Sequence, residues 1–207
     1  MYLHFFLFQR YPDDVYDRTW TPYNSIDWKK IDTSLTVDQA PSFSFIPVPP
    51  STVMRTAAIP ANASDNFEFS FLPKYNASTY YVFMYFAEIQ KLQENQIREF
   101  NIFVNGKLLR SEVNPFYLQN LYYYSSGISE TKLELWLNKT SRSTLPPLFN
   151  AVEIYMSKDL LQSETYQTDG KHYLVRYTDF TLKFLFTVNS RPFTSLFTCI
   201  TLTILSC

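Results

Sequence analysis

The hydrophobic residues of the chain alternate with polar ones over several short segments. Phe67, Phe69 and Phe71 fall on one face of such a segment, and Glu68 and Ser70 fall on the other. An alternation with a period of two is typical of a β-strand that buries one face. Three more segments are predicted to be strands: 98–104, 131–138 and 149–156.

One segment, 78–89, is apolar on both faces. Its sequence, STYYVFMYFAEI, predicts a central strand that is covered by another sheet. A hairpin is expected at Asn105-Gly106, and its return strand would begin at Lys107. No segment with a helical period extends beyond about 10 residues. These patterns together predict an all-β fold with little helix, a β-sandwich of the jelly-roll type.

Composition narrows the classes of function. The chain has 207 residues, of which 46% are hydrophobic and 18% aromatic, so it is long and apolar enough to bury a core of its own. A net charge of −1 without a Lys/Arg cluster argues against binding to nucleic acid. The cysteines and histidines lack metal-ligand spacing, so we expect no metal and no cofactor; they are Cys199, Cys207, His4 and His172.

Catalytic motifs are not evident. Asp13 and Asp14 follow Pro12, where a turn or cap role is expected rather than acid–base or cation chemistry. Asp17 and Arg18 are expected to form a local ion pair. The sequence shows neither a nucleophile motif nor a kinase motif. A glycosidase would need two carboxylates separated across a cleft, and the sequence does not place Glu88, Glu94 or Glu99 in that way. We therefore expect no enzymatic activity.

Aromatic residues cluster between 116 and 124 and are the candidate ligand-binding residues. They are Phe116, Tyr117, Tyr122, Tyr123 and Tyr124. An aromatic ring matches the apolar C–H face of a sugar, so these residues could form a sugar-binding platform. The alternative is packing within strands, which are enriched in tyrosine and phenylalanine.

Three N-x-[ST] sequons accompany predicted turns, at Asn62, Asn76 and Asn138. Glycosylation there would indicate a secreted or cell-surface chain. The alternative is that they are polar turn residues that never meet the glycosylation machinery. Residues 1–9 have a short apolar run but neither a basic leading region nor a cleavage site, so they fit a signal peptide poorly.

The segment 170–207 differs in composition from the rest of the chain. It is apolar and rich in threonine, and it has no charge from Pro192 to Cys207. Three alternatives are open: translated non-native sequence with poor order, a membrane anchor somewhat shorter than a spanning helix, and extra strands. This tail is therefore treated as separate from the domain before it.

Several segments occur in the order found in the malectin-like domain of plant leucine-rich-repeat receptor-like serine/threonine kinases, which the chain resembles over 10–169. They are RYPDDVYDRTWTPYN, TAAIPANAS, YYVFMYFAEIQKLQ, REFNIFVNG, STLPPLFNAVEIY and LLQSET. The resemblance implies a β-sandwich related to the carbohydrate-binding protein malectin. RYPDDVYDR resembles the opening of the second half of a tandem pair, which implies a fragment of a longer receptor.

The resemblance also implies a function. We expect a non-catalytic extracellular module of a receptor-like kinase that binds cell-wall carbohydrate or a peptide, at the cell surface and beside a receptor co-subunit. Membrane association would come through the parent receptor or through the tail. The alternatives are a structural or dimerisation module, or a truncated fragment without independent function.

Overall fold

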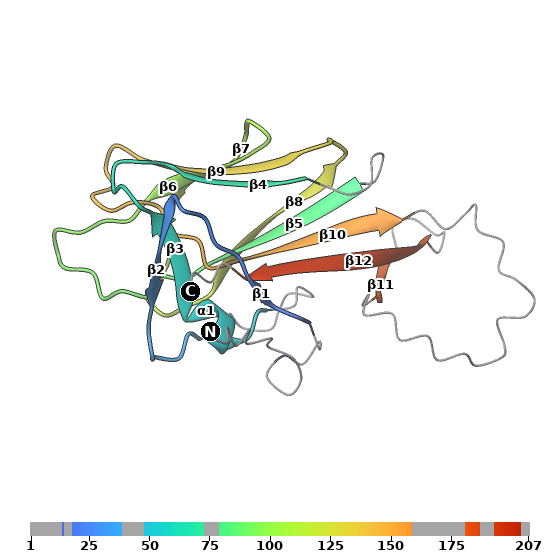
Figure 1. The fold of residues 1–207 in the computed structure, drawn as a ribbon, viewed down its shortest axis with the longest axis horizontal. Helices are drawn as coiled ribbons and strands as arrows, with labels where there is room; N and C mark the ends of the chain where they lie inside the picture. Colours follow the sequence, from blue (N-terminus) through green and yellow to red (C-terminus); the bar gives the residue numbers. More distant parts are fainter. Residues whose placement is uncertain are drawn as a thin grey trace, which may run out of the picture.

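Two β-sheets face each other and form a sandwich (Figure 1). The structure, a computed structural model, describes residue 14 and residues 18–38, 48–72, 79–158, 181–186 and 193–203; for the last two segments only the backbone is described. The larger sheet has the strand order β1-β12-β10-β5-β8, with β11 paired to β12. Its strands are β1 (Thr21–Pro22), β5 (Thr79–Phe86), β8 (Leu121–Ile128), β10 (Ala151–Lys158), β11 (Thr181–Phe186) and β12 (Phe193–Thr203).

The smaller sheet has the strand order β4-β9-β6-β7 and is antiparallel throughout. Its strands are β4 (Phe67–Phe71), β6 (Phe100–Val104), β7 (Lys107–Val113) and β9 (Leu133–Lys139). A separate ribbon of β2 (Trp28–Asp32) and β3 (Thr56–Pro60) lies beside the sandwich, and the four-residue helix α1 (Ser51–Met54) precedes β3. The described residues are therefore mostly strand with almost no helix, which confirms the predicted all-β sandwich.

The main core lies between the two sheets and is rich in aromatic rings. Phe149 is its centre, with ring centroids 5.5 Å from Phe67, 6.4 Å from Phe69 and 5.3 Å from Phe86. Alternate residues of the flanking strands complete this core, among them Val82, Met84, Leu133, Leu135, Leu137, Val152 and Ile154. Each buried aromatic side chain removes a large apolar area from water, so this layer supplies much of the stabilisation.

A second cluster covers part of the opposite face of the larger sheet. Trp20, Val53 and Met54 from the N-terminal part of the chain pack there around Tyr85 and Ala151. β5 therefore buries both faces, because Met84 and Phe86 contact the main core while Tyr85 contacts the second cluster. The prediction of a central strand within 78–89 is confirmed for Thr79–Phe86, with the second face half-buried at Tyr81 and Phe83.

The predicted hairpin is present between β6 and β7. Asn105 and Gly106 have φ values of 47° and 75°, the left-handed conformations that a tight two-residue hairpin turn requires. The Asn105 side chain fixes this turn to the start of β9. The Glu134 amide donates to Asn105 Oδ1 at 2.7 Å, and Asn105 Nδ2 donates to Glu130 Oε2 at 2.7 Å. The hairpin is thus stabilised by side-chain hydrogen bonds to residues 130–134 as well as by its local turn sequence.

The tail contributes backbone to the larger sheet. β12 pairs antiparallel with the whole length of β10 and parallel with the short β1. β11 pairs antiparallel with β12. Extra strands were one of three alternatives for 170–207, and the choice among them stays a prediction. Residues 159–180, 187–192 and 204–207 lie outside the described part of the chain.

Candidate functional site

Two of the candidate aromatic residues lie in the connection between β7 and β8. Phe116 and Tyr117 are 60% and 43% exposed. Their position is set by backbone hydrogen bonds, because the Glu88 amide donates to the Phe116 carbonyl at 3.0 Å and the Leu118 amide donates to the Glu88 carbonyl at 2.8 Å. Leu118 has a φ of 53°, which turns the chain into β8. Both rings therefore project from a fixed backbone into solvent.

The three tyrosines of β8 divide between its two faces. Tyr122 and Tyr124 lie on the face away from the main core, whereas Tyr123 packs against that core with its ring centroid 6.2 Å from that of Phe86. Tyr124 is 54% exposed and stacks on Phe83 at 5.8 Å with an interplanar angle of 24°. The structure therefore does not bring the three tyrosines together, because neighbouring residues of a strand point in opposite directions.

A cleft with acidic lining lies where β2, β3 and β4 meet. It has a volume of about 430 Å³ and is lined by Asp27, Trp28, Pro60, Ser64, Asp65, Asn66 and Glu68. Trp28 is fixed because it stacks on Phe67 at 4.4 Å. Three carboxylates beside an indole favour a cationic group. This cleft was not predictable from the sequence, because its residues come from three separate segments.

A buried ionic network fixes the N-terminal segment on the larger sheet. Arg18 donates to Asp14 Oδ2 at 2.8 Å, to Glu153 Oε1 at 2.6 Å and to the Val48 carbonyl at 2.7 Å. The Trp20 indole donates to Asp14 Oδ2 at 2.6 Å. Asp14 is 1% exposed, so it has a buried role in place of the predicted turn or cap role. Asp13 and Asp17, the proposed local partner of Arg18, lie outside the described residues.

Burial and charge act together on the ionisable groups of this network. Burial raises the pKa of the Glu153 carboxyl, and this is opposed by Arg18 and by the Tyr85 and Tyr155 hydroxyls, which donate to Oε2 at 2.7 and 3.2 Å. Burial lowers the pKa of Arg18, but Glu153 and Asp14 more than offset this and raise it above its ordinary value. Burial and the neighbouring Glu153 also raise the pKa of Tyr85. The network is a structural element of the core.

A second buried ion pair lies below the exposed loop aromatics. Arg98 is 1% exposed and donates to Glu88 Oε2 at 2.6 Å, to Gln90 Oε1 at 2.9 Å and to the Pro146 carbonyl. Glu88 also accepts from the Gln90 amide at 2.9 Å. Since the Glu88 backbone holds Phe116, this pair joins the connections 87–99, 114–120 and 140–150 at one end of the sandwich.

Glu99 is itself buried, but its ion-pair partner Arg142 is 65% exposed. The Thr140 hydroxyl and the Arg142 guanidinium donate to its carboxylate and lower its pKa. The other two glutamates that the sequence singled out differ: Glu88 is in the buried pair, and Glu94 is exposed. Within the described residues, these three carboxyl groups are structural or free on the surface.

The sequons differ in their surroundings. Asn62 is exposed in the turn between β3 and β4, where its Nδ2 donates to Asp65 Oδ1 at 3.1 Å. Asn138 is half-buried on β9, and Asn76 lies outside the described residues.

In the part of the chain that is described, no three His, Cys, Asp or Glu side chains are placed to hold a metal ion. No described helix has the length and apolar character needed to cross a bilayer.

Comparison with known sequences adds a family and relatives. A family model for the malectin-like domain matches residues 4–157. A probable LRR receptor-like serine/threonine-protein kinase of Arabidopsis thaliana is 40% identical over 163 residues, covering 77% of this chain and 18% of the relative. A putative leucine-rich repeat receptor-like protein kinase of the same plant is 40% identical over 162 residues, with the same coverage. The chain thus spans about a fifth of the length of these curated relatives.

Solved structures share the fold at lower sequence identity. The ANXUR1 extracellular domain of Arabidopsis thaliana has a TM-score of 0.56 and 16% identity, over 72% of this chain and 45% of that one. The plant complex of the peptide RALF23 with FER and LLG2 gives a TM-score of 0.52 and 19% identity, over 68% of this chain and 43% of that one. At such identities the likeness concerns the fold alone.

Proposed function

The chain belongs to the malectin-like domain family, and from this premise we propose that it is a non-catalytic recognition module of a receptor-like kinase that binds cell-wall carbohydrate or a peptide outside the cell. Its relatives are receptor-like kinases in which the matched region is a small part of the whole chain. The proposal assigns recognition to this region. It leaves phosphoryl transfer to the rest of such a receptor.

The exposed aromatic rings between 116 and 124 are the observation on which the proposal rests. The other aromatic side chains of the described sandwich are buried or half-buried, whereas Phe116, Tyr117 and Tyr124 are between 43% and 60% exposed. The backbone of each is fixed by β8 or by the bonds to Glu88. Rigid exposed rings can stack on the C–H face of a sugar at a small entropic cost. Carbohydrate is therefore the ligand class that these residues favour.

Replacing Phe116 and Tyr117 together by alanine is expected to weaken binding to plant cell-wall oligosaccharides by about tenfold or more, since each stacked ring contributes a substantial part of such contacts. Binding is measured on a glycan array and then by calorimetry with the best oligosaccharide. Tyr124→Ala tests the β8 ring separately. The control is Leu72→Ala, which removes a still more exposed apolar side chain directly after β4. Unchanged affinity in all three aromatic positions would refute the sugar-binding assignment.

The acidic cleft supports the peptide alternative. Asp27, Asp65 and Glu68 line it beside Trp28, and a lysine or arginine side chain of a peptide would pair with the carboxylates while its apolar part covers the indole. A peptide is the ligand named in one structurally similar complex, that of RALF23 with FER and LLG2. Basic peptides are therefore the second ligand class to test.

Glu68→Gln is expected to weaken the binding of a basic peptide by about threefold to tenfold at low salt, and the difference should shrink at high salt because exposed charges are screened. Fluorescence anisotropy with a panel of labelled lysine-rich and arginine-rich peptides measures this. Glu94→Gln removes an exposed carboxylate outside the cleft and serves as the control. Equal losses in both variants would show a non-specific charge effect and count against the cleft.

A further inference from the structure

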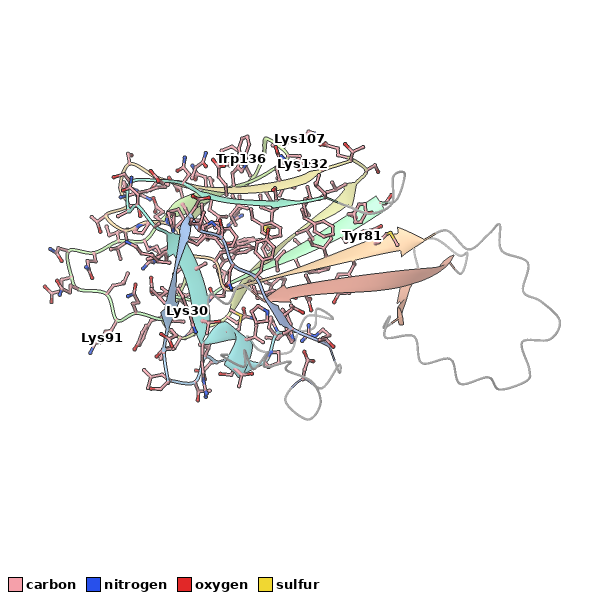
Figure 2. All side chains as sticks on the ribbon, in the orientation of Figure 1. Lys30, Tyr81, Lys91, Lys107, Lys132 and Trp136 are labelled. Atoms are coloured by element: carbon pink, nitrogen blue, oxygen red, sulfur yellow. The ribbon has the colours of Figure 1, made fainter. Side chains whose placement is uncertain are left out.

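The outer face of the smaller sheet has a row of apolar side chains. Trp136 on β9 lies opposite Phe103 on β6, and Phe103 lies opposite Leu108 on β7. Trp136 and Phe103 are half-buried, and Leu108 is 56% exposed. Figure 2 shows Trp136 on the side of the sheet that faces away from the larger sheet. None of these three side chains belongs to the two core clusters.

Asn138 lies beside this row. It is two residues beyond Trp136 on β9, and it shares the outer face because Leu135 and Leu137 point into the core. Two residues of a strand span about 6.6 Å, so the two side chains are neighbours along the strand. Asn138 is followed by Lys139 and Thr140, which completes a sequon. The sequon asparagine and the indole are thus adjacent on one surface.

Charged side chains lie on the side of Asn138 that is away from Trp136. Arg142 donates to Glu99 at 2.6 Å and lies 3.8 Å from Glu112, and the Glu112 amide donates to Asn101, the residue opposite Asn138. The side chains of Arg142 and Glu112 are 65% and 67% exposed. A group attached to Asn138 therefore finds ion pairs in one direction along the strand and aromatic rings in the other.

We propose that Asn138 carries an N-linked glycan whose first sugars lie on Trp136 and Phe103. The Asn138 amide nitrogen would form a bond to the anomeric carbon of an oligosaccharide carried on a polyprenyl diphosphate, with loss of one proton from nitrogen. The bond from that carbon to the diphosphate breaks, and the diphosphate leaves. The transferase of the secretory pathway supplies the catalysis before the strand is folded. This proposal rests on the proposed extracellular location.

Attachment explains why the glycan, rather than a free ligand, occupies the row. A tethered sugar has a high effective concentration at a surface within reach of its attachment point. Charged groups border the row, because Glu68 on β4 lies opposite Trp136, and Lys132, just before β9, pairs with Glu134 on that strand. Such charges oppose docking of another apolar sheet, while they can hydrogen-bond sugar hydroxyl groups. The first sugars supply the apolar C–H faces that the rings match.

The test is a double-mutant cycle on the full chain secreted from a eukaryotic host. Peptide mapping by mass spectrometry first measures the occupancy of Asn138 and Asn62. Thermal unfolding is then compared for the parent, Asn138→Gln, Trp136→Thr and the double variant. Removal of the glycan is expected to lower Tm by roughly 2–5 °C in the parent and by a much smaller amount with threonine at 136. Asn62→Gln, the matched control, should have the same effect in both backgrounds.

NMR gives a second measurement that does not depend on folding of the Trp136 variant. Cross-relaxation peaks are expected between the Trp136 indole protons and the first sugar. An occupied Asn62 with an unmodified Asn138 would overturn the proposal while leaving the extracellular location intact. A glycan effect on Tm that is equal in both backgrounds would also overturn it. So would binding of free cell-wall oligosaccharide to Asn138→Gln through Trp136, because the row would then be a ligand site.

Discussion

Replacing Arg18 by methionine is expected to lower the free energy of unfolding by about 3–5 kcal/mol, because it leaves Glu153 and Asp14 buried without their cation. Both carboxylates are at most 1% exposed, so water cannot replace the guanidinium. Methionine keeps much of the apolar volume of the arginine stem. The loss therefore reports the charge and its hydrogen bonds more than a cavity. Urea unfolding followed by tryptophan fluorescence measures it.

The double variant Arg18→Met/Glu153→Gln provides the control. Removing the anion along with the cation should recover a clear part of the lost stability, since the uncompensated charge is then reduced. Both variants should keep the m-value of the parent if the denatured state is unchanged. A stability of Arg18→Met within about 1 kcal/mol of the parent would mean that solvent or another group compensates the carboxylates, and the buried network would not hold the N-terminal segment.

The strands with a clear alternation were predictable because each pattern lies within one short segment. The period of two at Phe67, Phe69 and Phe71 gives β4, and the same rule gives β6, β9 and β10. The hairpin at Asn105-Gly106 has a local cause in its left-handed backbone. In contrast, the β2 and β3 ribbon has no such signal, because Lys29, Lys30 and the alanines of β3 do not alternate in hydrophobicity.

The division of the β8 tyrosines could have been inferred from the sequence. Residues 122, 123 and 124 are consecutive in a strand, so Tyr123 must point away from its neighbours. A single platform of all three tyrosines conflicts with that geometry. The same rule would have placed Trp136 and Asn138 on one face of TKLELWLN. The order of residues alone therefore predicts both of these arrangements. The structure adds that Phe103 and Asn101 on β6 lie opposite Trp136 and Asn138.

The buried charges and the acidic cleft could not be inferred from one sequence. Arg18 and Glu153 are 135 positions apart, and no periodicity joins them. The cleft likewise needs the β2–β3 pairing to bring Trp28 beside Pro60, and the turn into β4 to bring Asp65 and Glu68 to the same place. The resemblance marked RYPDDVYDR as a family segment. The structure supplies a physical reason for it, since Asp14 and Arg18 within this segment bind the sheet through Glu153.

Binding and stability are linked at the loop end of the sandwich. The residues proposed for ligand contact are exposed, but their backbone depends on buried charge. Phe116 and Leu118 both hydrogen-bond to the backbone of Glu88, and the Glu88 carboxylate is held by Arg98. A loop that is fixed before binding loses less entropy when a ligand arrives. Disturbing Arg98 should therefore affect both the fold and the proposed site.

Replacing Arg98 by methionine is expected to lower the free energy of unfolding by about 3–5 kcal/mol and to loosen the loop that contains Phe116. The substitution removes the cation beside Glu88 and the donors to Gln90 and Pro146. Urea unfolding measures the stability. Hydrogen exchange at the Leu118 amide, which donates to the Glu88 carbonyl, measures the local opening and should become at least tenfold faster.

The matched control is Arg142→Met. Its ion pair with Glu99 has an arginine that is 65% exposed, so the loss is expected to stay below about 1 kcal/mol and the exchange of Leu118 should not change. The comparison separates a buried cation from an exposed one in neighbouring loops. If Arg98→Met lowers the global stability but leaves Leu118 exchange slow under native conditions, the loop is held by other contacts. In that case the link between the buried pair and the position of Phe116 is wrong, whatever the cost to the fold.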